Sequence, residues 1–142
     1  MKYIFISLAV LTLGFLLPAC KHPKYAADKL PGKQIRWGNG GGIVGKEKSH
    51  ILLETGQIFS RDIMGSTVEA TKTRGKKAKT IFKQIDTLGL ARMVDNKPGN
   101  TYSFLEFQDG DMVSRVVWGD KNSPDLKSVQ ALFEELNGLL KK

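Results

Sequence analysis

The chain has 142 residues but only one cysteine and two histidines, so it is poor in the side chains that metal sites and thiol chemistry need. A single cysteine cannot form a disulfide within the chain, and packing alone must therefore hold the fold. Neither His22 nor His50 stands at a metal-site spacing from another histidine or an acid. A Gly-x-Ser-x-Gly nucleophile motif is also missing. We therefore expect no metal, no other cofactor and no nucleophilic serine of that type.

The one long apolar run lies at the N-terminus, where Lys2 precedes an uncharged stretch from Tyr3 to Leu17. As a helix this stretch would span roughly 22 Å, short of a hydrocarbon core of about 30 Å, which suits a signal peptide. Leu17-Pro18-Ala19-Cys20 follows and resembles the lipobox of bacterial lipoproteins, although Pro18 replaces the usual small or β-branched residue. The resemblance implies a signal peptide over residues 1–19 and lipid on Cys20. An ordinary secretory signal and an uncleaved anchor are the alternatives.

A lipidated Cys20 would hold the protein in the cell envelope, because two or three acyl chains suffice for stable anchoring. The formal net charge is +8. A positive protein attached to a membrane meets anionic headgroups, envelope glycans or acidic proteins, whereas the alternative is that the charge serves solubility alone. Export makes nucleic acid a poor partner. We therefore expect contact with a membrane and with an envelope protein or a polyanion.

The exported part is short enough for one domain. Residues 20–33 are polar and contain two prolines and a glycine, which predicts a flexible tether. Residues 34–142 then alternate between strand-like and helix-like patterns. Hydrophobic periodicity predicts strands over residues 34–37, 49–54, 58–63, 67–73, 102–108 and 112–118, and helices over residues 76–88 and 124–140. The order ββββ-α-ββ-α with short hairpin links predicts an α+β domain, in which an antiparallel sheet of five to six strands packs on two amphipathic helices.

A glycine-rich segment, residues 38–45, matches two phosphate-binding patterns by spacing alone. Glu47 occupies the position where a P-loop needs serine or threonine, and a strand rather than a helix follows. We therefore expect no nucleotide. The glycines are interpreted as allowing a bulge, a positive φ or a close crossing of Trp37. The alternative is that Trp37, Gly40, Gly41 and Gly42 contact a ligand or partner.

The densest group of basic residues precedes and enters the first predicted helix, and consists of Lys72, Arg74, Lys76, Lys77 and Lys79. Positive charge at a helix N-terminus opposes the helix dipole, so the placement is mildly costly. One hypothesis is contact with anionic headgroups or a polyanionic glycan. The other is a solvated loop.

Aromatic and acidic residues gather on the second predicted hairpin. Tyr102 and Phe104 share a strand face, whereas Phe107 lies on the opposite one. With helices on one face only, one aromatic set either forms an interaction surface or is covered by the tether or the glycine-rich segment. The acids of this region are Glu106, Asp109, Asp111 and Asp120. Paired carboxylates can hydrolyse glycosides, but acids beside a turn are usually solvated.

Four features together resemble a group of short uncharacterised Bacteroidota lipoproteins: the lipobox, Trp37-Gly38-x-Gly40-Gly41-Gly42-x-x-Gly45, Pro98-Gly99-Asn100 and Val117-Trp118-Gly119. The resemblance implies an exported α+β domain of unknown function, and the group offers no catalytic residues to carry over. In that phylum acidic residues after the lipidated cysteine accompany surface display, so the basic Lys21-His22-Pro23-Lys24 favours the periplasmic face. We expect a non-catalytic binding or accessory module. The alternatives are an inhibitor of an exported hydrolase and a small hydrolase that uses the hairpin acids.

Overall fold

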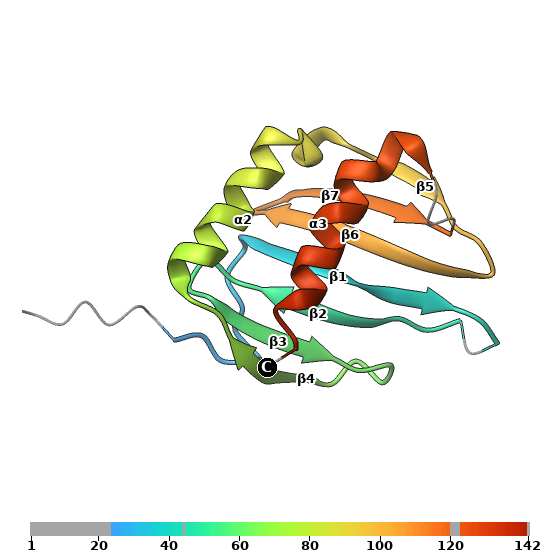
Figure 1. Cartoon of the computed structure of the whole chain (residues 1–142). Coiled ribbons are helices and arrows are strands. Elements are labelled where there is room, and N and C mark those ends of the chain that lie inside the picture. The colour runs from blue at the N-terminus through green and yellow to red at the C-terminus, as the bar shows by residue number, and fades with distance from the viewer. Residues whose placement is uncertain (1–23, 44, 120–122, 142) are drawn as a thin grey trace, which may run out of the picture.

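The computed structural model describes residues 24–43, 45–119 and 123–141. Cys20 and Asp120 lie outside these residues, so the lipidation site and one hairpin acid have no structural account. The described chain forms one sheet with two helices on the same face (Figure 1). In chain order the elements are β1 (Gln34–Gly41), β2 (Lys48–Leu52), β3 (Gln57–Arg61), β4 (Thr67–Lys72), α2 (Gly75–Thr87), the 3₁₀ turn η1 (Leu90–Arg92), β5 (Asp95–Lys97), β6 (Thr101–Asp109), β7 (Met112–Trp118), the 3₁₀ turn η2 (Pro124–Leu126) and α3 (Lys127–Gly138).

The α+β class is confirmed, but the predicted sheet of five to six antiparallel strands is wrong in its details. The described residues form a seven-stranded mixed sheet in the order β4-β3-β2-β1-β6-β7-β5. The additional strand, β5, pairs parallel to β7 through residues Asp95 to Lys97. This strand is short and polar and shows no apolar alternation, so no sequence pattern predicts it. It forms through backbone pairing with the edge of β7.

The centre of the sheet is the antiparallel pair β1–β6, which joins the N-terminal four-stranded meander to the C-terminal hairpin. Its register places Ile35 opposite Phe107 and Trp37 opposite Leu105. All four side chains are buried in the main core beneath the helices. Burying an apolar side chain of this size contributes about 1.5–3 kcal/mol, so this pairing supplies much of the core.

Both helices are amphipathic and turn their apolar sides toward the sheet. The buried residues are Ala78, Ile81, Phe82 and Ile85 in α2 and Val129, Leu132, Phe133 and Leu136 in α3. The second helix starts later than predicted, because Pro124 begins the 3₁₀ turn η2 and the α-helix begins at Lys127. Two edge-to-face aromatic pairs, Phe82–Phe107 and Trp118–Phe133, connect the helices to the sheet.

The predicted tether is packed against the sheet from Lys24 onward. Its Tyr25 contacts a second apolar cluster of Ile51, Leu53 and Phe59 on the face opposite the helices, as do Ala27 and Leu30. The Tyr25 backbone N–H donates to Gln57 Oε1, and Gln57 Nε2 donates back to the Tyr25 carbonyl, at 2.9 and 3.0 Å. The described part of residues 20–33 is therefore a cover for the sheet, in contrast to the flexible tether that its composition predicts.

Gly38 is required by the close approach of β1 to β2. A Cβ atom at this position would lie 2.1 Å from the Lys48 carbonyl oxygen, which belongs to the backbone and cannot rotate away. Gly138, near the end of α3, is the matched opposite, because a Cβ there would meet nothing within 4 Å.

We predict that Gly38→Ala lowers the free energy of unfolding by about 2–3 kcal/mol, since the strands must separate to admit the methyl group. Gly138→Ala should be neutral or stabilise by up to about 1 kcal/mol. Urea unfolding followed by tryptophan fluorescence measures both. Equal midpoints for the two variants would contradict the close approach.

Candidate functional site

Trp37 is a core residue. Its side chain is completely buried, and its indole Nε1–H donates to Asn137 Oδ1 of α3 at 3.1 Å. The ring also packs against His50, with ring centroids 5.4 Å apart. Burial lowers the pKa of His50, and nearby Lys48 lowers it further. The partner contact considered for Trp37 is therefore not available to its side chain in this structure.

The glycine-rich segment divides into a strand part and an exposed tip. Gly40 and Gly41 belong to β1, and a Cβ on Gly40 would collide with the Tyr102 ring at 2.7 Å. Gly41 has a φ of 89°, and a Cβ there would lie 2.4 Å from the Asn100 carbonyl oxygen. Gly42, with a φ of 69°, begins the exposed tip, where the Ile43 side chain is fully exposed. The expected positive φ is found at Gly41. The close approaches involve the Tyr102 ring and the Asn100 carbonyl, in contrast to the expected crossing of Trp37.

The predicted basic cluster separates into paired and unpaired lysines. Lys72 pairs with Glu69 of the same strand, and Lys77 pairs with Glu135 of α3 at 2.5 Å. Arg74 stands at the N-cap of α2 and makes no side-chain cap hydrogen bond. Lys76 and Lys79 instead line a shallow hollow of about 400 Å³ on the outer side of α2. Lys83 completes this hollow and was not part of the predicted cluster, although its helical spacing from Lys76 and Lys79 would have revealed it.

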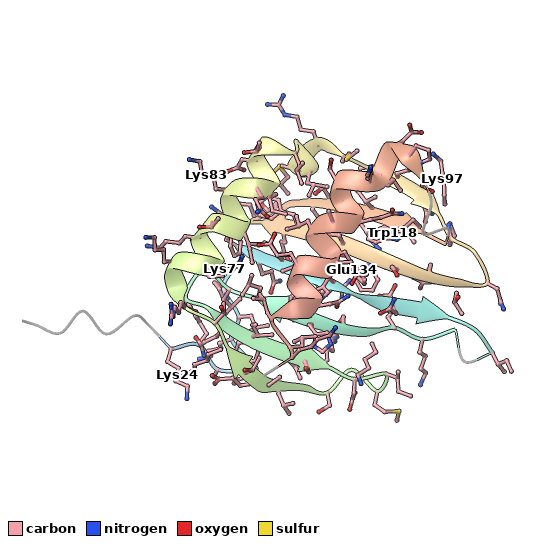
Figure 2. The ribbon with its side chains drawn as sticks, viewed as in Figure 1. Lys24, Lys77, Lys83, Lys97, Trp118 and Glu134 are labelled. Carbon is pink, nitrogen blue, oxygen red and sulfur yellow. The ribbon has the colours of Figure 1, made fainter. Side chains whose placement is uncertain are left out.

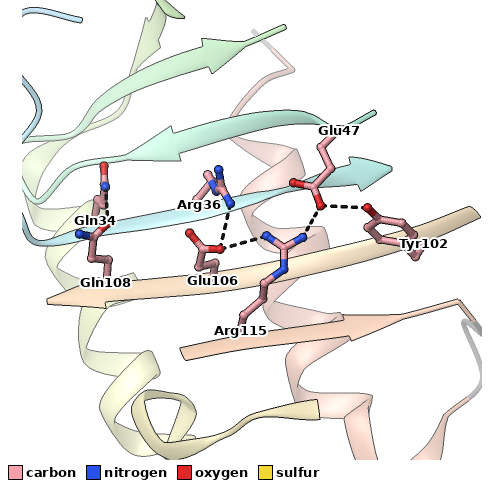
Figure 3. A network of polar contacts seen from close by, with 7 residues as sticks. All are labelled: Gln34, Arg36, Glu47, Tyr102, Glu106, Gln108 and Arg115. Atoms are coloured by element: carbon pink, nitrogen blue, oxygen red, sulfur yellow. Dashed lines mark hydrogen bonds and ion pairs between the residues drawn. The ribbon is translucent and has the colours of Figure 1, made fainter. Parts of the chain in front are cut away.

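Figure 3 shows a polar network on the sheet face opposite the helices. Glu106 Oε2 accepts hydrogen bonds from Arg36 Nη2 at 2.9 Å and from Arg115 Nη1 at 3.0 Å. Arg115 also bonds Glu47, which in turn accepts a 2.9 Å hydrogen bond from the Tyr102 hydroxyl. Burial, together with the Glu47 hydrogen bond, raises the pKa of Tyr102, so its hydroxyl stays protonated and donates. The network ties β1, β6, β7 and the β1–β2 connection together.

This network covers Phe104, which is completely buried although none of the described helices lies over it. The Arg115 guanidinium carbon stands 4.0 Å from the Phe104 ring centroid and that of Arg36 5.4 Å away. The predicted opposite facing of Phe104 and Phe107 is confirmed, because Phe107 packs in the core under the helices. The cover over Phe104 is, however, a pair of arginines. Strand alternation places Arg36 and Arg115 on this face, but the sequence does not say what they contact.

The described acids of the second hairpin have different surroundings. Glu106 is engaged by two arginines, whereas Asp109 and Asp111 are exposed at the turn. Among the residues that the structure describes, no group of three or more histidines, cysteines and acids is placed to hold a metal ion. Of the described hairpin acids, Glu106 is thus held by arginines, and the two turn acids face solvent.

A larger pocket, of about 530 Å³, opens beside α3, where β1 and β6 emerge from beneath the helices. The core-facing side of the sheet changes here from apolar to polar, since Asn39 and Ser103 continue the rows that contain Trp37 and Leu105. Asn39 donates to the Ser103 hydroxyl at 2.8 Å. The lining residues are Asn39, Ser103, Trp118, Lys127, Gln130, Ala131, Phe133, Glu134 and Asn137. No sequence motif marked this pocket, because it is assembled from strands and a helix distant in the chain.

Comparison of the chain with models of known protein families and with curated proteins finds no match. Within the described part of the chain, neither helix has the length and apolar character that crossing a membrane requires. Local geometry and charge are therefore the grounds on which the candidate sites are assigned.

We predict that Arg115→Ala lowers the free energy of unfolding by about 1–3 kcal/mol, because it removes two carboxylate contacts and uncovers Phe104. Arg92→Ala, at an exposed arginine of η1, should change it by less than about 0.5 kcal/mol. Chemical denaturation of both variants measures the difference. If the two arginines proved equally dispensable, the network would have no structural role.

Proposed function

We propose that this protein is a lipid-anchored component of the cell envelope, on its periplasmic face, whose folded domain is a non-catalytic binding module. Support for the anchor is the lipobox-like Leu17-Pro18-Ala19-Cys20 at the end of the apolar run. Support for the location is the basic sequence that follows Cys20. Only Lys21, His22 and Pro23 separate Cys20 from the described fold, and this link can span at most about 14 Å. The domain would therefore sit close to the membrane.

The pocket beside α3 is the observation that carries the binding role. Its volume of about 530 Å³ lies within the range of ligand sites, roughly 300–1,000 Å³. Side-chain amides and a hydroxyl surround it, and Lys127 and Glu134 give it one charge of each sign. Such a lining suits a polar partner without a large net charge. Trp118 and Glu134 lie well away from Lys24 in Figure 2, so an anchored domain would leave this pocket accessible.

A second candidate function, inhibition of an exported hydrolase, is favoured by the tips of two hairpins. Ile43 of the β1–β2 connection is fully exposed, as is most of Met64 in the β3–β4 connection. Lys46 Nζ stands 3.9 Å from Met64 Sδ, which places the two tips beside each other. Adjacent projecting apolar tips can enter a cleft. The hydrolase alternative has the least support, because Glu106 is occupied by two arginines.

Affinity capture of the full-length protein from detergent-solubilised native envelope, with mass spectrometry of what it retains, tests the two functions. Asn39→Trp should fill the pocket, Ile43→Asp should disable the hairpin tip, and Met112→Trp is the control at an exposed site outside the pocket lining. We predict that the native protein retains one stoichiometric partner. Asn39→Trp should weaken the affinity for this partner at least about tenfold, which corresponds to about 1.4 kcal/mol of binding free energy.

The Met112→Trp and Ile43→Asp variants should both retain the partner. Release by Ile43→Asp alone would replace the module with the inhibitor. A partner that all four forms retain would contradict both functions.

A further inference from the structure

The outer side of α2 carries a row of lysines that the core does not use. Lys76, Lys79 and Lys83 are spaced three and four residues apart, and this row is named here the α2 lysine stripe. All three side chains are exposed, and together with Gly75 and Thr80 they line one shallow hollow. The buried side of the helix lies opposite, at Ala78, Ile81, Phe82 and Ile85. Residues at this spacing share one helix face, so the stripe is a single surface.

No acid among the described residues neutralises the stripe by an ion pair, in contrast to the neighbouring Lys77, which Glu135 holds. The first turn of α2 contains no acid either. Three exposed lysines without an ion pair on one helix face produce a local positive potential, which favours an anionic surface.

We infer that the α2 lysine stripe docks on the anionic phospholipid surface of the membrane that carries the anchor. This inference rests on the proposed lipid on Cys20. Lys24, the first residue that the structure describes, lies on the side of the molecule where Lys77 and Lys83 also lie (Figure 2). The link from Cys20 to Lys24 reaches at most about 14 Å, so an anchored domain turns this side toward the bilayer.

The physical effect is electrostatic and short-ranged. Lysines act on an anionic membrane only within about a Debye length, roughly 10 Å at moderate salt, and a link of at most about 14 Å allows the domain to approach the membrane that closely. The stripe adds a second attachment to the acyl chains and fixes the orientation of the domain. An anionic glycan would offer similar charge, but the position of Lys24 beside α2 and close to the proposed anchor favours the bilayer.

Vesicle sedimentation tests this with residues 20–142 carrying Cys20→Ala, which contain every described element and no lipid. Anionic vesicles contain phosphatidylglycerol mixed with phosphatidylcholine, and neutral vesicles contain phosphatidylcholine alone. The stripe variant combines Lys76→Gln, Lys79→Gln and Lys83→Gln. The control variant combines Lys46→Gln, Lys48→Gln and Lys97→Gln, three exposed lysines outside α2, and has the same net charge. Circular dichroism checks that each variant folds.

We expect the parent to bind anionic vesicles at low salt and to lose binding in high salt and on neutral vesicles. The stripe variant should bind at least about tenfold more weakly, because each lysine near such a surface contributes about a factor of five, whereas the control should stay within about threefold of the parent. Equal losses in the two variants would show that net charge alone acts and would overturn the inference. It would also be overturned if the parent bound soluble alginate but no vesicles. Because the protein lacks lipid, either result is independent of whether Cys20 is modified in the cell.

Discussion

The antiparallel pairing of β1 with β6 is the contact on which the rest of the domain depends. Each strand belongs to its own locally connected unit, and only this pairing places Ile35 and Trp37 beside Leu105 and Phe107. That combined apolar surface is what α2 and α3 cover. The Trp37 indole then fixes α3 through Asn137, so sheet pairing and helix docking reinforce each other.

No described helix lies over the opposite face of the sheet, and two other parts of the chain cover its apolar residues. Near β2 and β3 the N-terminal segment covers Phe59 and its neighbours with Tyr25 and Leu30. Over β1, β6 and β7 the guanidinium groups of Arg36 and Arg115 cover Phe104 and are held by carboxylates. Arginine can bury an apolar ring while its charged end stays hydrated. The aromatic rings of Phe104 and Phe59 are therefore buried on this face without a described helix over them.

Periodicity in the sequence was sufficient for the α+β class, the six longer strands and both helices, because most of these elements have an apolar side and β4 alternates β-branched residues. Periodicity was insufficient for a strand that forms through backbone pairing alone and for a polar segment that nevertheless packs on the sheet. β5 has no apolar alternation, and the polar segment from Lys24 packs through a few apolar side chains and Gln57. The basic cluster is visible in the sequence, but the pairing of Lys77 requires the position of Glu135 on a distant helix. The pocket beside α3 likewise exists only after folding.

Lipid on Cys20 is the condition from which the proposed location and orientation both follow, since it would place the membrane within about 14 Å of Lys24. Incorporation of radiolabelled palmitate into the full-length protein, expressed in a bacterium that processes lipoproteins, measures it directly. We predict labelling of the native sequence and its complete loss in Cys20→Ala. An unlabelled native protein, or equal labelling of Cys20→Ala, would contradict the anchor.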